Sequence, residues 1–353
     1  MPARGSTVGI PGGPRRPSAG PAMLAFAARS EPRPAGEWRE RFLSQREVYR
    51  RWYLGAGEAA RPSLEVCEAK LTEHMPELLG VYHDLVELAA GDEVDARMLS
   101  LYDPPPFITG CSQAAWVRGT PMLIRNYDYP ASRLEGILVQ TEWSGRRVIG
   151  MSDCMWGLLD GVNDDGLAVS LTFGGRTASG EGFAIPLVVR YILETCTSVP
   201  EACAVLARVP VHASQNVTLV DRTGDFMTAY VAPDRPLRLV RTPVTTNHQG
   251  AVEWPEYEQV IHSVDRENCL LSLIDDPTMT TERLKDAFLQ APIHSGGYRS
   301  GTGTLYTAAY LPGEGRVEMR WPSGERWIES FDAFVALDHT EVFDASGPRA
   351  RAA

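Results

Sequence analysis

The chain has 353 residues, of which 44% are hydrophobic and 22% charged, and these proportions are ordinary for a globular protein with an ample core. Its formal net charge of −11 at pH 7 argues against nucleic acid as a partner, because no basic block is interleaved with aromatic residues. No stretch approaches the roughly 18–20 apolar residues that a membrane-spanning helix needs, so we expect no membrane partner and a cytoplasmic location.

The first 35 residues are rich in Pro, Gly, Arg and Ser, and we expect a disordered leader there. Its only apolar run, residues 22–28, is at the lower limit for the core of a signal peptide. Apolar residues at helical intervals then predict helices over 38–52, 63–90 and 92–101, within a helical segment that spans 36–110. Three consecutive prolines, at 104–106, end this helical region.

From residue 111 to about 340 the pattern favours short strands grouped around a few helices, and residues 341–353 are expected to form a disordered tail. Few strand–helix–strand alternations occur, so we expect an α+β fold of packed antiparallel sheets covered by helices. Strands are predicted at 114–117, 122–129, 137–143, 148–152, 167–173, 217–220, 226–231, 237–241, 304–310, 316–321 and 327–329, and helices at 184–196, 200–207, 256–274 and 281–289.

The six cysteines are scattered, and no CxxC pair or Cys/His cluster with zinc spacing occurs. We therefore expect free thiols, no metal site and no resident cofactor. The six are Cys67, Cys111, Cys154, Cys196, Cys203 and Cys269.

Cys111 is distinguished by the glycine before it. Gly110 has no Cβ, so a strained peptide bond is tolerated there and the thiol can reach its own upstream carbonyl. Cleavage before Cys111 would leave a free α-amine with a pKa of about 7.7–8.0, which suits it to act as the base for the thiol. The simpler interpretation of an isolated Gly-Cys pair is a buried structural cysteine after a turn.

The strand Arg125-Asn126-Tyr127-Asp128 supplies a guanidinium that favours the thiolate and a carboxylate that can orient an α-amine. Arg125 and Asp128 are an odd number of residues apart, so an ideal strand directs them to opposite faces. Both can serve one site only if the strand bends or ends between them. A surface ion pair is the structural alternative.

Three later segments are also polar. Residues 161–169 predict a hairpin turn leading into a buried strand, and that role is structural. In the segment 215–225, a strand followed by a turn, Asn216 could face a site, although satisfying backbone groups at a strand edge suits it better. Asn247, within Thr-Thr-Asn-His-Gln, carries an amide suited to donate to an oxyanion, the alternative being an ordinary loop Asn-His pair.

The order of these segments resembles the isopenicillin-N acyltransferase-like family (acyl-CoA:6-aminopenicillanic acid acyltransferases) among the N-terminal nucleophile hydrolases. The resemblance spans residues 110–321. It rests on five motifs in sequence: Gly-Cys-Ser, Arg-Asn-Tyr-Asp-Tyr, Gly-Val-Asn-Asp-Asp-Gly-Leu-Ala, Asn-Val-Thr-Leu-Val-Asp-Arg-Thr-Gly and Thr-Asn-His.

The resemblance implies a four-layer αββα sandwich, made as a precursor that cuts itself between Gly110 and Cys111 into a small and a large subunit that stay associated. It implies that Cys111 is the nucleophile, that Asp128 contacts its α-amine, and that Arg125 lies beside the thiol. Asn247 would donate to the oxyanion, with the Phe173 backbone N–H as a second donor, and Asn216 and His248 are further substrate-contact candidates.

By the same resemblance the substrate is a small-molecule amide or an acyl thioester, with acyl-CoA left open as a co-substrate, and the N-terminal fragment is the protein's own partner. There are three departures from the family pattern, and the last of them bears on the substrate more than on the chemistry. Ser112 stands where Thr is usual, Tyr129 where Trp is common, and residues 77–81 retain only a remnant of the signature expected before the cysteine.

Other classes of protein remain open. A papain-like pair would join Cys111 or Cys154 to a histidine, but it needs a helix that begins at the cysteine, and the segment 114–125 is strand-like. No Gly-x-Ser-x-Gly occurs for a serine hydrolase. The glycine-rich stretch 299–304 lacks the lysine of a phosphate-binding loop and is expected to be a flexible loop bordering the site. The histidines in question are His248, His262 and His294.

A non-catalytic small-molecule-binding protein on the same fold is a further alternative. The intact set of catalytic residue types favours an enzyme instead. Whether water or an amine would resolve the thioester depends on how well the site excludes water, which the sequence leaves open. The set is Gly110, Cys111, Arg125, Asp128 and Asn247.

Overall fold

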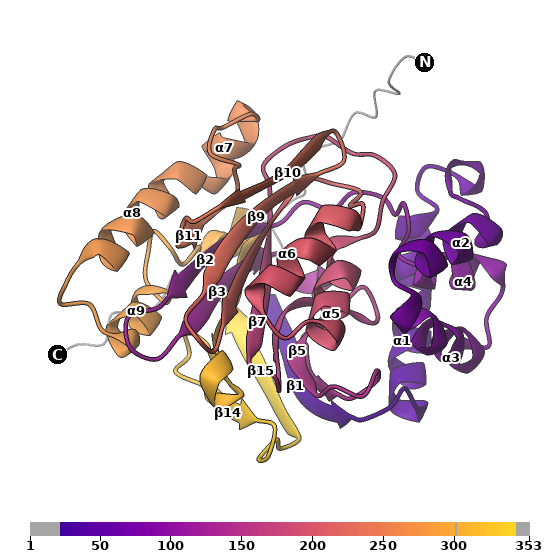
Figure 1. Cartoon of the computed structure of the whole chain (residues 1–353), viewed down its shortest axis with the longest axis horizontal. Helices are drawn as coiled ribbons and strands as arrows, with labels where there is room; N and C mark the ends of the chain where they lie inside the picture. The colour runs from indigo at the N-terminus through magenta and orange to yellow at the C-terminus, as the bar shows by residue number, and fades with distance from the viewer. Residues whose placement is uncertain (1–21, 301, 344–353) are drawn as a thin grey trace.

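The computed structural model describes residues 22–300 and 302–343, and it is built on two stacked β-sheets (Figure 1). The larger sheet has nine strands in the order β10-β9-β8-β7-β6-β5-β4-β1-β15, antiparallel except for the parallel β1–β4 pair. Its strands are β1 (Ala22–Glu31), β4 (Ile137–Thr141), β5 (Val148–Asp153), β6 (Gly157–Asn163), β7 (Leu167–Phe173), β8 (Gln215–Asp221), β9 (Phe226–Ala232), β10 (Arg235–Val240) and β15 (Leu337–Phe343).

The smaller sheet carries the predicted catalytic residues. Its order is β11-β2-β3-β12-β13-β14, and all neighbours are antiparallel. In the β2–β3 pair, Cys111 lies opposite Tyr127 and Gln113 opposite Arg125. These strands are β2 (Gly110–Trp116), β3 (Met122–Tyr129), β11 (Val244–Thr245), β12 (Gly303–Leu311), β13 (Arg316–Arg320) and β14 (Arg326–Ser330).

Alternation along β2 and β3 sorts the side chains between two apolar cores. Cys111, Ala115 and Tyr127 belong to the main core, which lies between the sheets, whereas Ala114 and Ile124 belong to a second core on the outer face. Both faces of these strands are therefore buried, which explains why every residue of β2 and β3 is buried.

Helices cover the outer face of each sheet and complete the four layers (Figure 1). α5 and α6 lie on the nine-stranded sheet, whereas α8 and α9 cover the six-stranded sheet through the second core. The α+β fold class and the αββα sandwich predicted from the sequence are thus confirmed. The helices are α5 (Ile185–Thr195), α6 (Val199–Arg208), α7 (Pro255–Ile261), α8 (Ser263–Asp275) and α9 (Thr281–Ala287).

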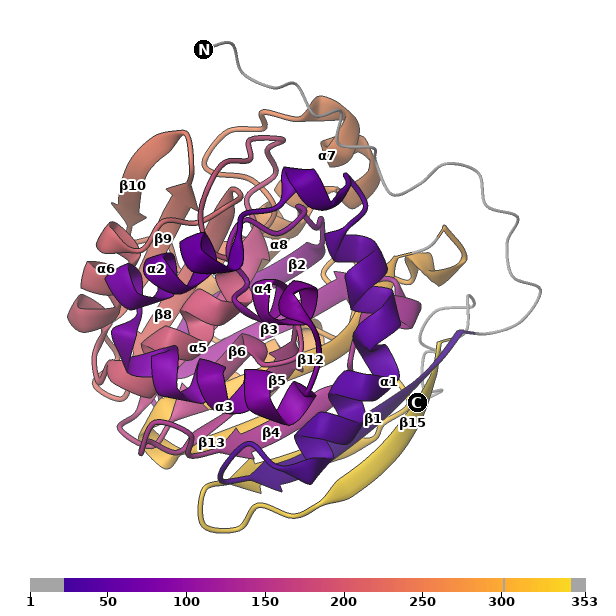
Figure 2. The same ribbon diagram turned by 90° about the vertical axis from the view of Figure 1, so that its right-hand side faces the viewer.

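The remaining four helices form a separate group at one end of the sandwich (Figure 2). Hydrogen bonds tie them to the turn between β5 and β6. The Trp38 indole donates to the Met155 carbonyl (3.0 Å), and the Trp156 indole donates to the Leu99 carbonyl (2.8 Å). These helices are α1 (Gly36–Tyr53), α2 (Leu64–His74), α3 (Leu79–Ala89) and α4 (Glu93–Leu99).

The expected disordered leader is wrong for residues 22–31, which form β1 inside the nine-stranded sheet. Phe26 is 1% exposed and packs edge-on against Trp321, so the short apolar run is a core strand. Residues 341–343, placed in the tail, are the end of β15, which pairs with β1. Residues 1–21 and 344–353 lie outside the described residues.

Two predicted helices are each broken. Pro76 separates α2 from α3, because a proline cannot continue the hydrogen bonding of the preceding turn. His262 separates α7 from α8 with a left-handed backbone (φ 49°). Strand β6 was not predicted, since its glycines at 157 and 161 weaken the strand pattern.

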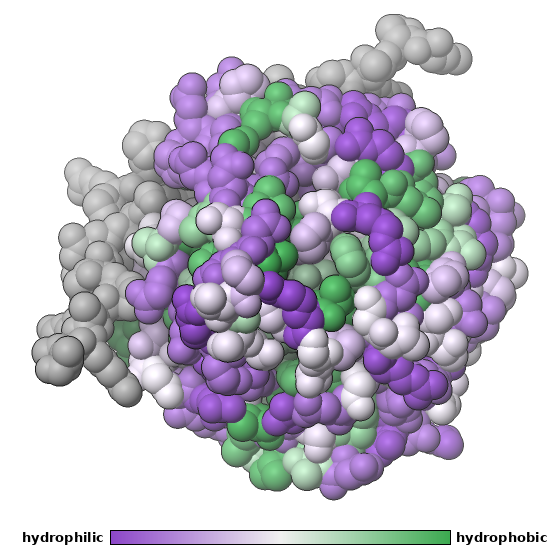
Figure 3. All heavy atoms as spheres, turned by 60° about the vertical axis from the view of Figure 1, so that its left-hand side comes forward, coloured by the Kyte–Doolittle hydropathy of each residue, from purple (hydrophilic) through white to green (hydrophobic). Residues whose placement is uncertain are grey.

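No helix among the described residues is long and apolar enough to cross a membrane. On the face shown in Figure 3, hydrophilic and hydrophobic side chains are interspersed.

Candidate active site

Cys111 is the second residue of β2, and its thiol points into the space between the sheets, where it is completely buried. The Arg125 Nη2 donates to the Cys111 Sγ at 2.9 Å, and the Thr109 hydroxyl lies 3.7 Å from the same sulfur. Arg125 lies on the neighbouring strand β3, two residues before Tyr127, which is the residue opposite Cys111. The guanidinium and the thiol thus meet on the inner face of the sheet.

Asp160 of β6 holds the other side of the Arg125 guanidinium. Its carboxylate accepts from Arg125 Nη1 at 2.6 Å, and both side chains are fully buried. Two phenols complete the network, since Tyr306 donates to Asp160 at 2.6 Å and Tyr310 also donates to it. The buried Arg125 guanidinium is thereby neutralised and oriented by Asp160, which belongs to the opposite sheet.

Burial raises the pKa of the Cys111 thiol above its ordinary value. The Arg125 guanidinium acts in the opposite direction, while the Asp128 carboxylate adds to the rise. Arg125 therefore lowers the pKa of the thiol, as expected, but burial and the other groups together raise it. In the uncut chain the net shift favours the neutral thiol.

Gly110 and Asp128 face each other across the β2–β3 pair on the side away from the thiol. A Cβ on Gly110 would lie 2.5 Å from Ile261 Cδ1 and 3.0 Å from Asp128 Cβ, so a side chain there would force these neighbours to shift. Asp128 Oδ1 accepts from the Thr304 hydroxyl at 2.6 Å. Its Oδ2 is buried and has no hydrogen-bond donor among the described residues.

Strand β3 continues unbroken through Arg125 and Asp128, and the two side chains lie on opposite faces. The bend that the sequence required for a shared site is absent from this strand. The Cys111 thiol lies on one face of the sheet, and the Cys111 backbone borders the other face. The site therefore spans both faces of the sheet.

Asn247 bridges the residues on both sides of Gly110. Its Oδ1 accepts from the Cys111 backbone N–H at 2.9 Å, and its Nδ2 donates to the Thr109 carbonyl at 3.3 Å. The same Nδ2 donates to the Phe173 carbonyl at 3.1 Å. Phe173 thus meets Asn247 through its carbonyl, whereas the sequence nominated its backbone N–H.

Arg266 of α8 is a site residue that the sequence analysis missed. It donates through Nη1 to the Cys111 carbonyl and to the Ser112 hydroxyl (2.7 Å), and through Nη2 to Asn247 Oδ1 (2.8 Å). Its Nη1 also lies 3.6 Å from Asp128 Oδ2. Arg266 is 2% exposed, and its buried guanidinium binds the backbone of Cys111.

His248 and Asn216 support the Asn247 segment rather than facing the thiol. The His248 ring contacts the Ser263 hydroxyl (Nδ1, 2.8 Å) and the Glu267 carboxylate (Nε2, 3.1 Å). Ser263 also accepts from the Asn247 backbone N–H at 2.7 Å. Asn216 donates to the carbonyls of Thr246 (2.9 Å) and His248 (3.1 Å).

The papain-like alternative finds no support in these contacts. Among the described residues, the Cys111 sulfur has Thr109 and Arg125 as partners, and the Cys154 sulfur has Asp153, so neither thiol meets a histidine. In addition, Cys111 lies at the start of a strand and not at the start of a helix, as a papain-like site would need. In the glycine-rich stretch, residue 301 lies outside the described residues, and Gly303 begins β12.

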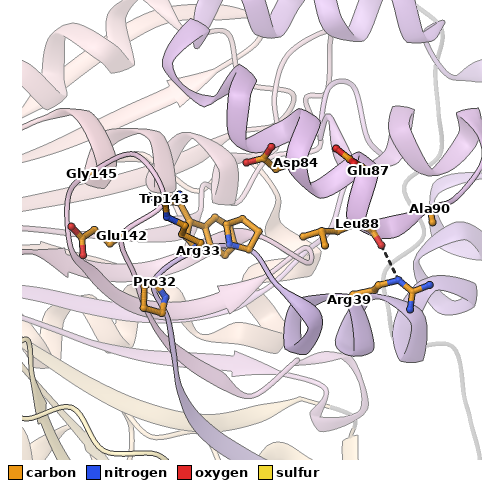
Figure 4. A pocket seen from close by; sticks show the side chains of 11 residues that line it. Pro32, Arg33, Arg39, Asp84, Glu87, Leu88, Ala90, Glu142, Trp143 and Gly145 are labelled. Carbon is orange, nitrogen blue, oxygen red and sulfur yellow. Dashed lines mark hydrogen bonds between the residues drawn. The ribbon is translucent and has the colours of Figure 1, made fainter.

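Two cavities lie near the N-terminal helices. One of about 840 Å³ is lined by residues such as Arg33, Asp84 and Trp143 (Figure 4), and its lining includes none of the residues that contact Cys111. The other, of about 730 Å³, we name the α1 cavity, and it borders the segment that precedes Gly110. It is lined by Ser44, Gln45, Val48, Tyr49, Arg51, Trp52, Pro106, Phe107, Ile108, Tyr129, Ser132, Arg133, Leu134, Asp153 and Cys154.

Comparison with known protein families supports the family resemblance found in the sequence. A family model described as acyl-coenzyme A:6-aminopenicillanic acid acyl-transferase matches residues 116–326, well over half of the chain. That range includes Arg125, Asp128, Asn247 and Arg266 and begins just after Cys111. No curated protein sequence matches the chain.

Solved structures also align with the chain at low sequence identity, and three of them illustrate this. Penicillin V acylase from Agrobacterium tumefaciens is 14% identical, with 63% of this chain and 86% of that chain covered and a TM-score of 0.44. A mutant of conjugated bile acid hydrolase from Clostridium perfringens is 13% identical (67% and 97% covered, TM-score 0.39). An N-acylethanolamine-hydrolyzing acid amidase orthologue from Caenorhabditis elegans is 12% identical (58% and 93% covered, TM-score 0.40). On the family match, the chain belongs to the acyl-coenzyme A:6-aminopenicillanic acid acyl-transferase family.

Proposed function

We propose that the chain is a precursor that cuts itself between Gly110 and Cys111, and that the mature enzyme uses Cys111 as an N-terminal nucleophile. Residues 36–110, together with β1, would then belong to the small subunit and residues from 111 onward to the large one. The proposal is carried by one observation: Asn247 contacts the peptide groups on both sides of Gly110, and Arg266 binds the Cys111 carbonyl that follows them.

In the self-cleavage step, the Cys111 thiol attacks the Gly110 carbonyl carbon, and the Gly110–Cys111 C–N bond breaks as the thioester forms. The thiol proton passes to the nitrogen that becomes the Cys111 α-amine. Water then hydrolyses the thioester, which leaves a Gly110 carboxylate and restores the thiol. Because Gly110 has no Cβ, the Ile261 and Asp128 side chains can lie close to this peptide.

The same groups serve the mature enzyme. The neutral α-amine accepts the thiol proton, and the thiolate attacks the substrate amide carbon. Asp128 Oδ2, which has no hydrogen-bond donor within residues 22–300 and 302–343, is available to the new α-amine, and Asn247 Nδ2 becomes available to the oxyanion once Thr109 withdraws. The C–N bond breaks, and the leaving amine takes the proton from the α-ammonium.

Release of the acyl group depends on the acceptor. Water gives a carboxylic acid, whereas an amine gives a new amide, and both restore the thiol. A small-molecule amide, or an acyl thioester such as acyl-CoA, would supply the acyl group. Incubating the mature protein with an acyl thioester and candidate amines would distinguish hydrolysis from acyl transfer.

The test of self-cleavage is the mass and N-terminal sequence of the purified protein. We expect two fragments, the larger beginning Cys-Ser-Gln-Ala, and a single uncut chain for Cys111→Ala. Cys154→Ala is the matched control, since it removes another buried thiol and should still be cut. A Cys111→Ala chain that splits at the same bond would overturn the proposal.

A further inference from the structure

The α1 cavity borders the proposed active site on the face that carries the thiol. Tyr129, which lines the cavity, and Tyr127, which lies opposite Cys111, are neighbours on the inner face of β3, and their ring centroids are 5.5 Å apart. Phe107 and Ile108 line the cavity three or four residues before Cys111. Its volume of about 730 Å³ is in the range of small-molecule sites.

The lining of the α1 cavity is largely apolar. Trp52 of α1, Phe107, Ile108 and Leu134 supply hydrocarbon or aromatic surface. Arg51 and Arg133 also line it, and both are exposed, which places them toward the solvent side. An apolar body with one polar end directed inward would match this distribution.

Asp153 is the acidic group in this lining, and it is only 6% exposed. No Lys, Arg or His of the described residues forms an ion pair with it, and the Cys154 thiol, at 3.6 Å, is its side-chain partner. Glu135 lies close enough to raise its pKa, but the Glu135 oxygens are occupied by Tyr49 (2.6 Å), Ser152 (2.9 Å) and the Met155 N–H (2.7 Å). Asp153 is therefore a buried carboxyl group that lacks a cation.

The other titratable groups around Asp153 do not supply that cation. Tyr49 of α1, Tyr127 and Tyr129 of β3, and Cys154 are neutral acids when protonated, and burial raises the pKa of each. Burial, reinforced by Glu135, raises the pKa of Asp153 to about 8. A ligand ammonium would favour the ionised carboxylate and displace its proton.

We propose that the α1 cavity binds an apolar arm of the substrate that ends in an amino group, and that the Asp153 carboxylate is the partner of this group. The existence of the binding site is independent of the reaction, whereas its assignment to a substrate rests on the proposed function. Asp153 is then a specificity determinant, because a neutral or anionic end would leave its carboxyl without a cation.

The test is calorimetric titration of the Cys111→Ala chain at neutral pH with three matched probes: 4-phenylbutylamine, 4-phenylbutanol and 4-phenylbutyrate. We expect the amine to bind most tightly and to release about one proton on binding, which titration in two buffers of different ionisation enthalpy measures. Asp153→Asn should weaken amine binding by about 10–100-fold and abolish proton release. Asp84→Asn, in the other cavity, should leave both unchanged.

Val48→Trp provides a second variant should Asp153→Asn fail to fold. Val48 lines the cavity and is 63% exposed, so a larger side chain there should block the amine without disturbing the core. Equal affinity for the amine and the alcohol, or unchanged amine binding in both variants, would overturn the proposal. Because Cys111→Ala lacks the nucleophile, amine binding can succeed even where wild-type protein fails to cleave itself, which separates the two proposals.

Discussion

At the scale of single residues, the site depends on two arginines that approach Cys111 from opposite faces of one sheet. Arg125 meets the thiol, whereas Arg266 meets the carbonyl and the groups around it. The sequence motif identified Arg125, because it lies beside Asp128 on a recognisable strand. Arg266 lies on a charged helix between Asp265 and Glu267, where a surface role is the ordinary expectation.

Asp160 was also missed, since it precedes the recognised turn motif and lies in a strand that was not predicted. We expect Asp160→Asn to lower the apparent pKa of the Cys111 thiol, because the Arg125 charge would no longer be neutralised. The midpoint of thiol alkylation should therefore move to lower pH. Tyr310→Phe removes a donor to Asp160 but keeps its charge, so it should not lower the midpoint. An unchanged midpoint in Asp160→Asn would show that this carboxylate does not govern the thiol.

Arg266→Lys should slow self-cleavage strongly. The planar guanidinium contacts the Cys111 carbonyl, Ser112 and Asn247 at once, and a single ammonium cannot reproduce that fork. The amount of uncut chain against time, followed by denaturing gel electrophoresis, measures the effect. Arg283→Lys, on the exposed side of α9, is the control. Equal cleavage rates in the two variants would remove Arg266 from the proposed machinery.

At the scale of elements, the β5–β6 turn links the N-terminal helices to the site. Cys154 and Met155 both have positive φ, 54° and 71°, which non-glycine residues rarely adopt. Their backbone N–H groups are held by Tyr49 (3.1 Å) and Glu135 (2.7 Å). Sequence reasoning predicted neither the turn nor β6, because no glycine marks its left-handed positions.

This turn makes stability depend on pH through Asp153. Its folded-state pKa of about 8 exceeds the ordinary 3.8, so between these values the folded chain holds a proton that the unfolded chain has lost. The free energy of unfolding should therefore fall as pH rises from about 4 to about 8. Urea unfolding of Cys111→Ala across this window measures the slope. Adding Asp153→Asn should flatten it, whereas adding exposed Asp84→Asn should not; equal slopes in the two variants would refute the role of Asp153.

At the scale of the whole molecule, the order of strands, helices and motifs from residue 111 was largely predictable from hydrophobic periodicity. β1 was not, because a short alanine-rich run after a Pro- and Gly-rich stretch gives little signal of its own. Its place between β4 and β15 depends on pairing with strands that are distant in sequence. The polar contacts of Asn247 and Arg266 likewise join residues more than a hundred positions apart from Cys111.

That architecture predicts that the two fragments remain associated after cleavage. Removing the N-terminal fragment would take β1 out of the nine-stranded sheet and withdraw Trp38 and Tyr49 from the β5–β6 turn. The fragments should co-elute on size-exclusion chromatography and separate only in denaturant. Separation in ordinary buffer would contradict this arrangement.

The central claim, that mature Cys111 is both the new N-terminus and the nucleophile, is tested most directly by peptide mapping after partial alkylation with iodoacetamide. Although burial raises the pKa of all six cysteine thiols in the uncut chain, cleavage should expose Cys111 to its own amine. We predict that the first label appears on a peptide that begins at Cys111, and that activity falls in proportion to it. First labelling of Cys154, or loss of activity without a labelled peptide that begins at Cys111, would contradict the account.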